Sequence, residues 1–251
     1  MKHLLRLSTI TAVFCSIAAS AHSEVQQFAI GGNDSTRIAE IISPLIPATD
    51  STNIITKLTE EDFERVAKEL EIEVATIKAV VDIEAGVSHN GFVAPGQALI
   101  NFDLSVFKSR LKRAGINPAK YKQSHPVVFA RPNTRKYGSY GKAQYARLNS
   151  ALTINEKIAL ESCFWGMFQI GGFNWKMCGC SSPEDFHNKI NQSEAMQLEL
   201  FANFITSNGL VKHLRNKNWR AFARGYNGAS YAKRGYHTRM ANSYRKHAQK
   251  R

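Results

Sequence analysis

The stretch IKAVVDIEAG, residues 77–86, places a carboxylate at the end of an apolar helix pattern. Ile77, Val80 and Val81 share one helix face at about 100° per residue, and the glutamate, Glu84, falls near the middle of that face. Apolar surroundings and the negative end of the helix dipole disfavour the ionised form, so we expect its pKa to be raised. A carboxylic acid that is still protonated near neutral pH suits a general acid. The alternative is a short helix whose frayed end leaves this carboxylate in water.

A second stretch, ALESCFWGMFQIGGFNW at 159–175, combines clustered aromatic residues with glycines. Gln169 is a polar side chain among apolar neighbours and could present its amide to a sugar. Trp165 or Phe168 could supply a flat face on which a sugar ring stacks. For each apolar residue of the stretch, the alternative is an ordinary place in the hydrophobic core.

A third stretch, ARGYNGASYAKRGY at 223–236, contains Tyr226 and Asn227 between glycines. We expect these two residues to lie in a loop between helices, and such loops often carry binding residues. An isolated Asn-Gly pair is also a common turn, which is the alternative interpretation.

The N-terminal residues have the organisation of a secretory signal peptide. Two basic residues precede an apolar run over about 9–19, which is too short to span a membrane. The small-residue triplet at 19–21 predicts that residues 1–21 are removed and that the protein acts in the periplasm or outside the cell. A lipid-modified Cys15 is the rival interpretation, and the bulky phenylalanine before it argues against that modification.

The formal net charge is +13, and removal of the two basic residues of the signal leaves +11. So basic a chain favours an anionic partner. Because export separates the protein from nucleic acid, we expect no nucleic-acid partner and consider anionic envelope polymers instead. A merely soluble basic surface is the alternative. We expect a monomer.

Three cysteines follow the predicted signal: Cys163, Cys178 and Cys180. In an oxidising compartment we expect Cys163 to form a disulfide with Cys178 or with Cys180, because the latter two are nearly adjacent. One thiol would stay free. A zinc site is disfavoured, because the three cysteines form no CxxC pair and no histidine stands at ligand spacing.

Capping signals and apolar periodicity predict a mainly α fold with little strand. Residues 22–57 are expected to form a poorly structured N-terminal arm, and residues 58–251 a single domain. Helices are expected to begin at Thr59 and Asp103 and to cover 74–85, 144–151, 154–164, 184–191, 194–208, 218–225 and 230–248. Thr153 and Ser182 are expected as N-caps, residues 86–102 as loop or hairpin, and residues 117–141 as an irregular surface segment.

The motifs IKAVVDIEAG, FDLSVF, SCFWGMFQIGGFNW and FARGYNGASYAKRGY follow one another within residues 59–248. In this order and spacing they resemble the N-acetylmuramidase family of phage endolysins and bacterial wall hydrolases. The middle and late motifs are also similar to segments of goose-type lysozymes and lytic transglycosylases. The resemblance implies a lysozyme-like helical domain and places Glu84 at the family's catalytic acid.

The family's second acidic position is usually a glutamate in a Phe-Glu-x-His context, and here the chain reads Phe102-Asp103-Leu104-Ser105. The carboxylate of Asp103 is therefore one methylene shorter, and serine replaces the histidine. The separation of two catalytic carboxylates distinguishes inverting from retaining glycosidases. The role of Asp103 is open between a helix N-cap and a second catalytic group, and the two roles are compatible.

The resemblance implies hydrolysis of the β-1,4 bond between N-acetylmuramic acid and N-acetylglucosamine in peptidoglycan, with no metal or organic cofactor. Glu84 would protonate the glycosidic oxygen, and Asp103 would activate water or stabilise the oxocarbenium-like transition state. Gln169, Tyr226 and Asn227 would hold the glycan strand. One alternative is a lytic transglycosylase, which uses a single acid and leaves an anhydro sugar. The other is a non-enzymatic cationic protein that binds cell wall or lipopolysaccharide.

Overall fold

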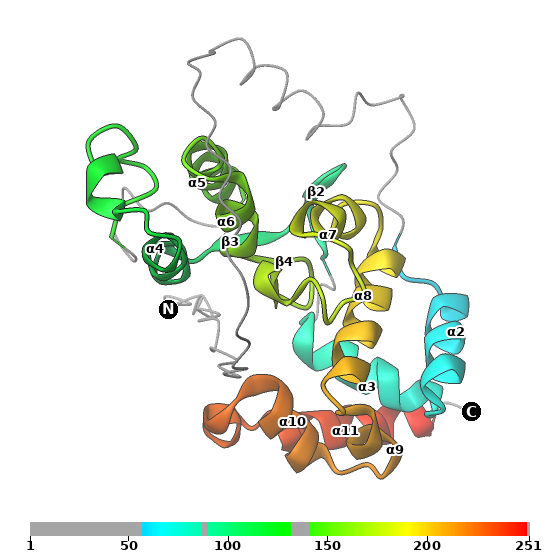
Figure 1. Ribbon diagram of the computed structural model, residues 1–251. Coiled ribbons are helices and arrows are strands. Elements are labelled where there is room, and N and C mark those ends of the chain that lie inside the picture. Colours follow the sequence, from blue (N-terminus) through cyan, green and yellow to red (C-terminus); the bar gives the residue numbers. More distant parts are fainter. Residues whose placement is uncertain (1–56, 87–89, 132–140, 250–251) are drawn as a thin grey trace, which may run out of the picture.

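The computed structural model describes residues 57–86, 90–131 and 141–249 (Figure 1). The predicted signal peptide and all but the last residue of the predicted arm lie outside this part of the chain. The α-helices are α2 (Glu60–Leu70), α3 (Val74–Glu84), α4 (Leu104–Arg113), α5 (Lys142–Leu152), α6 (Glu156–Glu161), α7 (Pro183–Ile190), α8 (Glu194–Ser207), α9 (Val211–Arg215), α10 (Trp219–Asn227) and α11 (Tyr236–Ala248). Within the described part of the chain, no helix combines the length and apolar character that a membrane crossing requires.

Short elements connect these helices. The 3-10 helices are η1 (Pro118–Tyr121), η2 (Gly172–Asn174) and η3 (Ala229–Arg234). The strands are β1 (Phe92–Ala94), β2 (Gln97–Ala98), β3 (Ile100–Phe102), β4 (Cys163–Trp165) and β5 (Ile170–Gly171). β1 and β2 form a small antiparallel hairpin, as expected for the segment 86–102.

Capping side chains begin several helices where the sequence predicts. Thr59 and Asp62 form the capping box of α2, in which the Asp62 carboxylate accepts the Thr59 N–H at 3.0 Å. Ser182 caps α7, as expected. The cap predicted at Thr153 is wrong: the side chain of Asn155 caps α6 instead.

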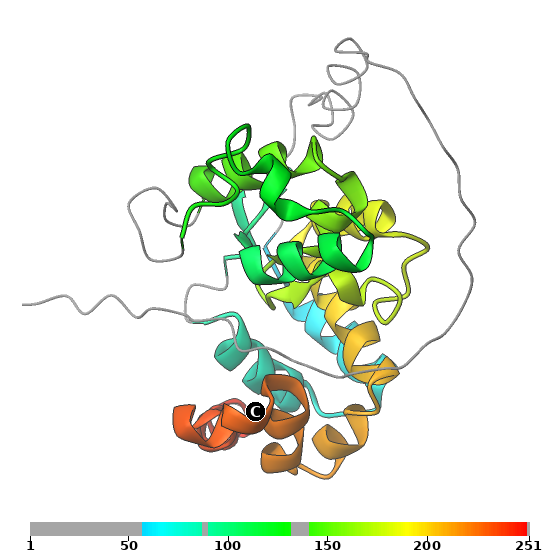
Figure 2. The same ribbon diagram turned by 60° about the vertical axis from the view of Figure 1, so that its left-hand side comes forward.

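The helices form two groups that α8 connects (Figures 1 and 2). Helices α2, α3, α9, α10 and α11 lie in one group, and α4 to α7 lie with the larger sheet in the other. α8 packs against α2 of the first group and against α7 of the second. Leu198, Phe201 and Ile205 are buried on α8, at the spacing of three and four residues that defines one helix face.

α3 is central to the first group, because it packs against both α2 and α11. Its residues Ile77, Val80 and Val81 are each 0% exposed, so the predicted apolar face of this helix is confirmed. Since α3 carries Glu84 at its end, the packing of this face fixes where the carboxylate emerges.

A three-stranded antiparallel sheet in the order β3-β4-β5 organises the second group. Phe102 pairs with Cys163 and Ile100 pairs with Trp165. The strand that leads into α4 therefore lies directly beside the aromatic stretch. A Cβ atom on Gly172 would come within 2.2 Å of the backbone oxygen of Leu160, so the chain requires a glycine after β5.

Most predicted helices differ from the structure by one or two residues at an end, and three of the differences concern segments near the site. The helix expected over 154–164 ends at Glu161, because the residues that follow pair as β4. The helix expected to end at residue 225 continues to Asn227. The helix expected over 230–248 is divided into η3 and α11 by Gly235, whose φ of 63° belongs to the left-handed region.

Candidate active site

Glu84 is the last residue of α3, and Gly86 follows with a φ of 74°, the left-handed geometry common after a helix end. Burial of the carboxyl group raises the pKa of Glu84 to about 7. A hydrogen bond from Asn227 and the positive charge of Arg239 lower this pKa, but by less than burial raises it. The residue as a whole is partly exposed. The predicted acid is therefore partly protonated at neutral pH, as a general acid requires.

Asn227 holds the acid directly. It is the last residue of α10, is 8% exposed, and donates a hydrogen bond from Nδ2 to Glu84 Oε1 over 2.9 Å. The helix ends there because Gly228 adopts φ 73° and ψ −172°, a conformation open to glycine. The prediction of a loop at Asn227 is wrong. Its amide donor faces the carboxylate, so a neutral donor orients Glu84 with less stabilisation of the charge than a cation would give.

Tyr226 ties α10 to the aromatic stretch. Its hydroxyl donates to the backbone oxygen of Phe168 over 2.9 Å. Its ring stacks on Phe222 with 5.9 Å between ring centroids and meets Phe201 edge-on at 5.4 Å. The loop predicted at Tyr226 is likewise helix, and this residue connects the Glu84–Asn227 pair to the turn between β4 and β5.

Gln169 lies in the turn between β4 and β5 with a φ of 49°, a left-handed conformation that costs a non-glycine residue about 1 kcal/mol. Its side-chain Nε2 donates to the backbone oxygen of Gly166 over 2.8 Å. Among the described residues, its amide oxygen has no hydrogen-bond partner. The neighbouring Phe168 carbonyl accepts the Tyr226 hydroxyl, so this turn lies against the end of α10. A contact between Gln169 and a glycan stays a prediction.

Gln197, in the middle of α8, is a supporting residue that sequence analysis missed. It is 0% exposed, its Oε1 accepts the Met167 N–H at 2.9 Å, and its Nε2 donates to the backbone oxygens of Gly91 and Ile190 at 3.1 and 3.0 Å. A Cβ atom on Gly91 or Gly166 would come within 2.4 or 2.7 Å of Gln197 Oε1, so both glycines make room for it. One buried amide thus fixes the β4–β5 turn and the loop before β1.

Asp103 lies at the start of α4, in the second group of helices. Its Oδ1 accepts hydrogen bonds from the N–H groups of Ser105 and Val106 at 2.8 and 3.0 Å and from the Ser105 hydroxyl at 2.5 Å. Its own N–H donates to the backbone oxygen of Ser162 over 2.8 Å. The N-cap role is confirmed. No hydrogen bond joins Asp103 to Glu84 within the described ranges, and a catalytic role for Asp103 stays a prediction.

Two predicted sugar-stacking residues belong to the core. Trp165 is 0% exposed, and its indole N–H donates to the backbone oxygen of Leu160 over 3.0 Å. Phe168 is 4% exposed and stacks on Phe201 with ring centroids 4.3 Å apart. In this structure neither ring has a face free for a sugar, so this expectation is wrong, and both residues support the turn that carries Gln169.

Comparison with known families identifies the chain. A model of the family described as "Muramidase: N-acetylmuramidase" matches residues 73–248. The chain belongs to the N-acetylmuramidase family. It is therefore a glycoside hydrolase that acts on peptidoglycan, and the matched residues include every segment of the candidate site.

A solved structure agrees with this membership. The chain is similar to a Burkholderia AP3 phage endolysin, with 33% sequence identity, a TM-score of 0.64, and coverage of 76% of this chain and 71% of that chain. A comparison with curated proteins gives no match. The expected lysozyme-like helical fold is confirmed.

The three cysteines in the described part of the chain are free, buried thiols: Cys163, Cys178 and Cys180. Cys163 lies on β4, whereas Cys178 and Cys180 lie in the segment between η2 and α7. The disulfide expected between Cys163 and either of the other two is not formed in the structure. Burial raises the pKa of all three thiols, that of Cys180 to about 11, so they are protonated at neutral pH.

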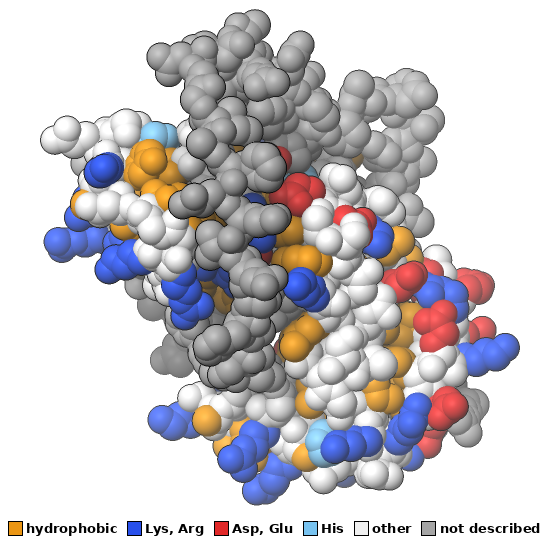
Figure 3. All heavy atoms as spheres, viewed as in Figure 1, with side chains coloured by type: hydrophobic (Ala, Val, Ile, Leu, Met, Phe, Trp, Pro, Cys, Tyr) orange, Lys and Arg blue, Asp and Glu red, His pale blue; other side chains and the backbone are white. Residues whose placement is uncertain are grey.

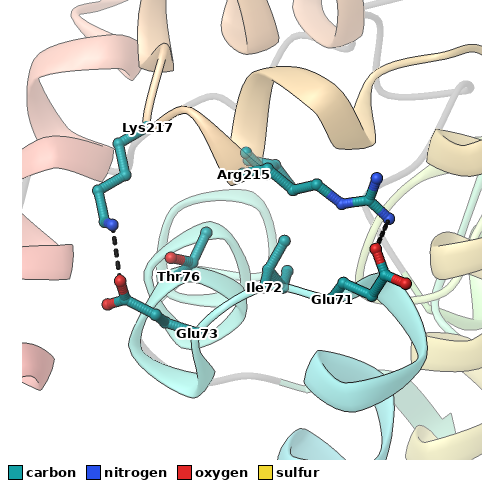
Figure 4. A pocket seen from close by; sticks show the side chains of 7 residues that line it. Glu71, Ile72, Glu73, Thr76, Arg215 and Lys217 are labelled. Atoms are coloured by element: carbon teal, nitrogen blue, oxygen red, sulfur yellow. Dashed lines mark hydrogen bonds and ion pairs between the residues drawn. The ribbon is translucent and has the colours of Figure 1, made fainter.

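A pocket of about 240 Å³ lies between the α2–α3 connection and the region around α9 (Figure 4). Two ion pairs line this pocket: Arg215 with Glu71 at 3.0 Å, and Lys217 with Glu73 at 2.6 Å. Glu84, at the far end of α3, does not line the pocket. Because its charged groups already pair with each other, we do not assign the glycan to it.

Proposed function

We propose that the chain hydrolyses the β-1,4 bond between N-acetylmuramic acid and N-acetylglucosamine, with Glu84 as the general acid. The observation that carries this proposal is the Glu84 carboxyl group, whose pKa burial raises to about 7. The Asn227 amide holds it at 2.9 Å. Protonated Glu84 would give its proton to the glycosidic oxygen while the bond to the anomeric carbon breaks.

Asp103 would serve the second half of the reaction. Its Oδ1 is used in capping α4, which holds the side chain in one orientation. Its carboxylate would then take a proton from the water that attacks the anomeric carbon, or stabilise the positive charge on the sugar. Gln169 would accept a hydrogen bond from a glycan N–H or hydroxyl at its amide oxygen. Solvent would return the proton to Glu84.

A second candidate is the lytic transglycosylase reaction, in which a hydroxyl of the substrate attacks in place of water. One observation favours it: three donors occupy Asp103 Oδ1, and no hydrogen bond between Asp103 and Glu84 is present among the described residues. A reaction with Glu84 as its single acid needs no second carboxylate.

Mass spectrometry of the products from purified sacculi separates these reactions. Reducing muropeptides that end in N-acetylmuramic acid would support the proposal, and anhydro ends would support the transglycosylase. Reducing ends on N-acetylglucosamine would mean that the other glycosidic bond is cleaved. An intact glycan would mean that the protein is a non-enzymatic cationic binder of the cell wall. A parallel digestion with Glu84→Gln shows which products depend on the acid.

We propose that the protein meets this substrate in the periplasm or outside the cell, after loss of residues 1–21. Peptidoglycan lies in that compartment, and the signal-like organisation of the first residues supports export. An N-terminus at His22 in the protein recovered from the envelope or medium would agree with this, whereas retention of residues 1–21 in the cytoplasm would contradict it.

A further inference from the structure

Positive charge is concentrated in the last part of the chain. Residues 200–251 contain twelve Lys and Arg and no Asp or Glu, whereas residues 1–199 contain 21 basic and 20 acidic residues. Figure 3 shows Lys and Arg side chains over the lower part of the molecule, where α9, α10 and η3 lie, and Asp and Glu side chains mainly on the side of α2. A surface with cations and few anions attracts an anionic partner.

Three exposed cations of this region lie on α10, η3 and α11, which pack against one another. Arg224 is on α10 three residues before Asn227, so the two residues are neighbours on one side of the helix. Lys233 is on η3, which directly follows this helix end and packs against α10. Arg239 is on α11, close enough to Glu84 to lower the pKa of that acid.

The charges of these three cations are available to a ligand. Among the described residues, none of the three is in an ion pair with a carboxylate. The guanidinium of Arg239 lies 6.0 Å from the centroid of the Tyr236 ring. By contrast, Arg215 and Lys217 near α9 are already paired with carboxylates of the α2–α3 connection.

We infer that Arg224, Lys233 and Arg239 form a docking surface for the free carboxylates of the peptide stems of peptidoglycan. This inference rests on the proposed function. A glycan strand whose scissile bond lies at Glu84 carries its peptide from the adjacent N-acetylmuramic acid, so the stem emerges beside the acid. Long Arg and Lys side chains suit carboxylates at a variable distance. The chain therefore prefers strands that carry peptides over bare glycan.

The test compares two preparations of the same sacculi: strands that keep their peptides, and strands from which an amidase has removed them. New reducing or anhydro ends are counted for both at several substrate concentrations. We expect kcat/KM to be about tenfold higher for peptide-bearing strands, because several exposed charge contacts each contribute a factor of a few. The preference should shrink at high salt.

Arg224→Gln/Lys233→Gln is expected to lose most of this preference through a higher KM for peptide-bearing strands, with a smaller change on bare strands. The matched control, Lys120→Gln/Lys122→Gln on and beside η1, removes the same charge away from α10 and should keep the preference. Equal cleavage of both preparations by the unmodified protein overturns the docking surface but leaves the proposed function standing. If the unmodified protein cleaves neither preparation, both the docking surface and the proposed function are overturned.

A membrane partner gives a different outcome. If Arg224→Gln/Lys233→Gln keeps the preference for peptide-bearing strands but loses binding to vesicles of anionic phospholipid, the surface docks on lipid and the inference is wrong. If neither the variant nor the unmodified protein binds such vesicles, and the variant has lost the preference for peptide-bearing strands, the inference is supported.

Discussion

At the scale of single residues, the proposed acid Glu84 would have to be desolvated enough to hold a proton and exposed enough to reach a glycosidic oxygen. Its place at the end of a packed helix supplies the desolvation that raises its pKa to about 7, and it leaves the residue partly exposed. Glu84→Gln should therefore keep the fold, because the side chains are nearly isosteric, and should lower wall lysis by two or more orders of magnitude, since an amide cannot donate the proton. Release of soluble muropeptides from sacculi measures this loss. Lysis above a tenth of the unmodified rate would remove Glu84 from the mechanism.

The same substitution also has a pH-dependent effect on stability. Because the folded-state pKa of Glu84 is raised to about 7, the folded protein binds a proton more tightly than the unfolded chain does. Stability is therefore lost as pH rises from the unfolded pKa near 4.5 towards 7. Glu84→Gln removes this loss, so it should stabilise the protein by roughly 1 to 3 kcal/mol at pH 8 and by little at pH 4. Thermal unfolding at the two pH values measures the difference.

Asn227 is expected to act on the acid through the hydrogen bond at 2.9 Å. This bond stabilises the carboxylate form, so Asn227→Ala should raise the pKa of Glu84 and move the alkaline decline of kcat/KM to higher pH. The rate at the optimum should fall about tenfold or more, because the acid is less well oriented. Asn227→Gln tests whether a longer amide restores the profile. An unchanged pH profile in Asn227→Ala would leave Asn227 with a purely structural role.

The sequence predicts the helix-terminal position and the raised pKa of Glu84 well, and the position of Asn227 only in part. The apolar face and the terminal glycine that define Glu84 lie within ten residues, so a local pattern contains them. The Asn227 contact joins residues 143 positions apart, and no local pattern reports it. A glycine-flanked Tyr-Asn pair indicated function, but the structure was needed to show that the amide faces the acid.

At the scale of elements, Asp103 caps the start of α4, and substitutions can distinguish this capping role from a catalytic role. Asp103→Asn should retain the cap, because asparagine caps helices about as well as aspartate, whereas Asp103→Ala should cost about 1 kcal/mol of stability. If Asp103 assists catalysis, Asp103→Asn lowers turnover sharply at unchanged stability. Denaturant unfolding combined with sacculus digestion measures both quantities. Full activity of Asp103→Asn would favour the single-acid reaction.

The β4–β5 turn depends on α8 through Gln197. Gln197→Ala leaves the Met167 N–H and the backbone oxygens of Gly91 and Ile190 without their partner in the core. We expect a loss of roughly 2 to 4 kcal/mol in stability, because each buried unsatisfied group costs about 1 kcal/mol or more. Activity per folded molecule should also fall, since the turn carries Gln169. Urea unfolding measures the first effect, and a loss below about 0.5 kcal/mol would contradict this role.

Elements whose signals are local were predictable, and those that depend on partners were not. The capping box at Thr59 and the N-caps Ser182 and Asp103 are read from three or four residues, and the structure confirms them. β4 was predicted as the end of a helix, because its residues favour either state and only pairing with β3 decides between them. Gln197 was invisible, since a polar residue within a helix is ordinarily on the surface.

At the scale of the whole molecule, the distribution of charge predicts how the protein meets the cell wall. The acidic residues end at Glu199, so the cations beyond it present a field of one sign to an anionic polymer. Binding of the Glu84→Gln variant, which leaves the wall intact, should fall about tenfold or more as salt rises from about 0.05 to about 0.5 M, because the Debye length shortens to a few ångström. Pull-down on purified sacculi measures this. Lys120→Gln/Lys122→Gln in the same background removes only two charges. The salt dependence of its binding should therefore be reduced only slightly. Binding that is constant across this range would mean that uncharged contacts, and not the basic surface, anchor the protein to its substrate.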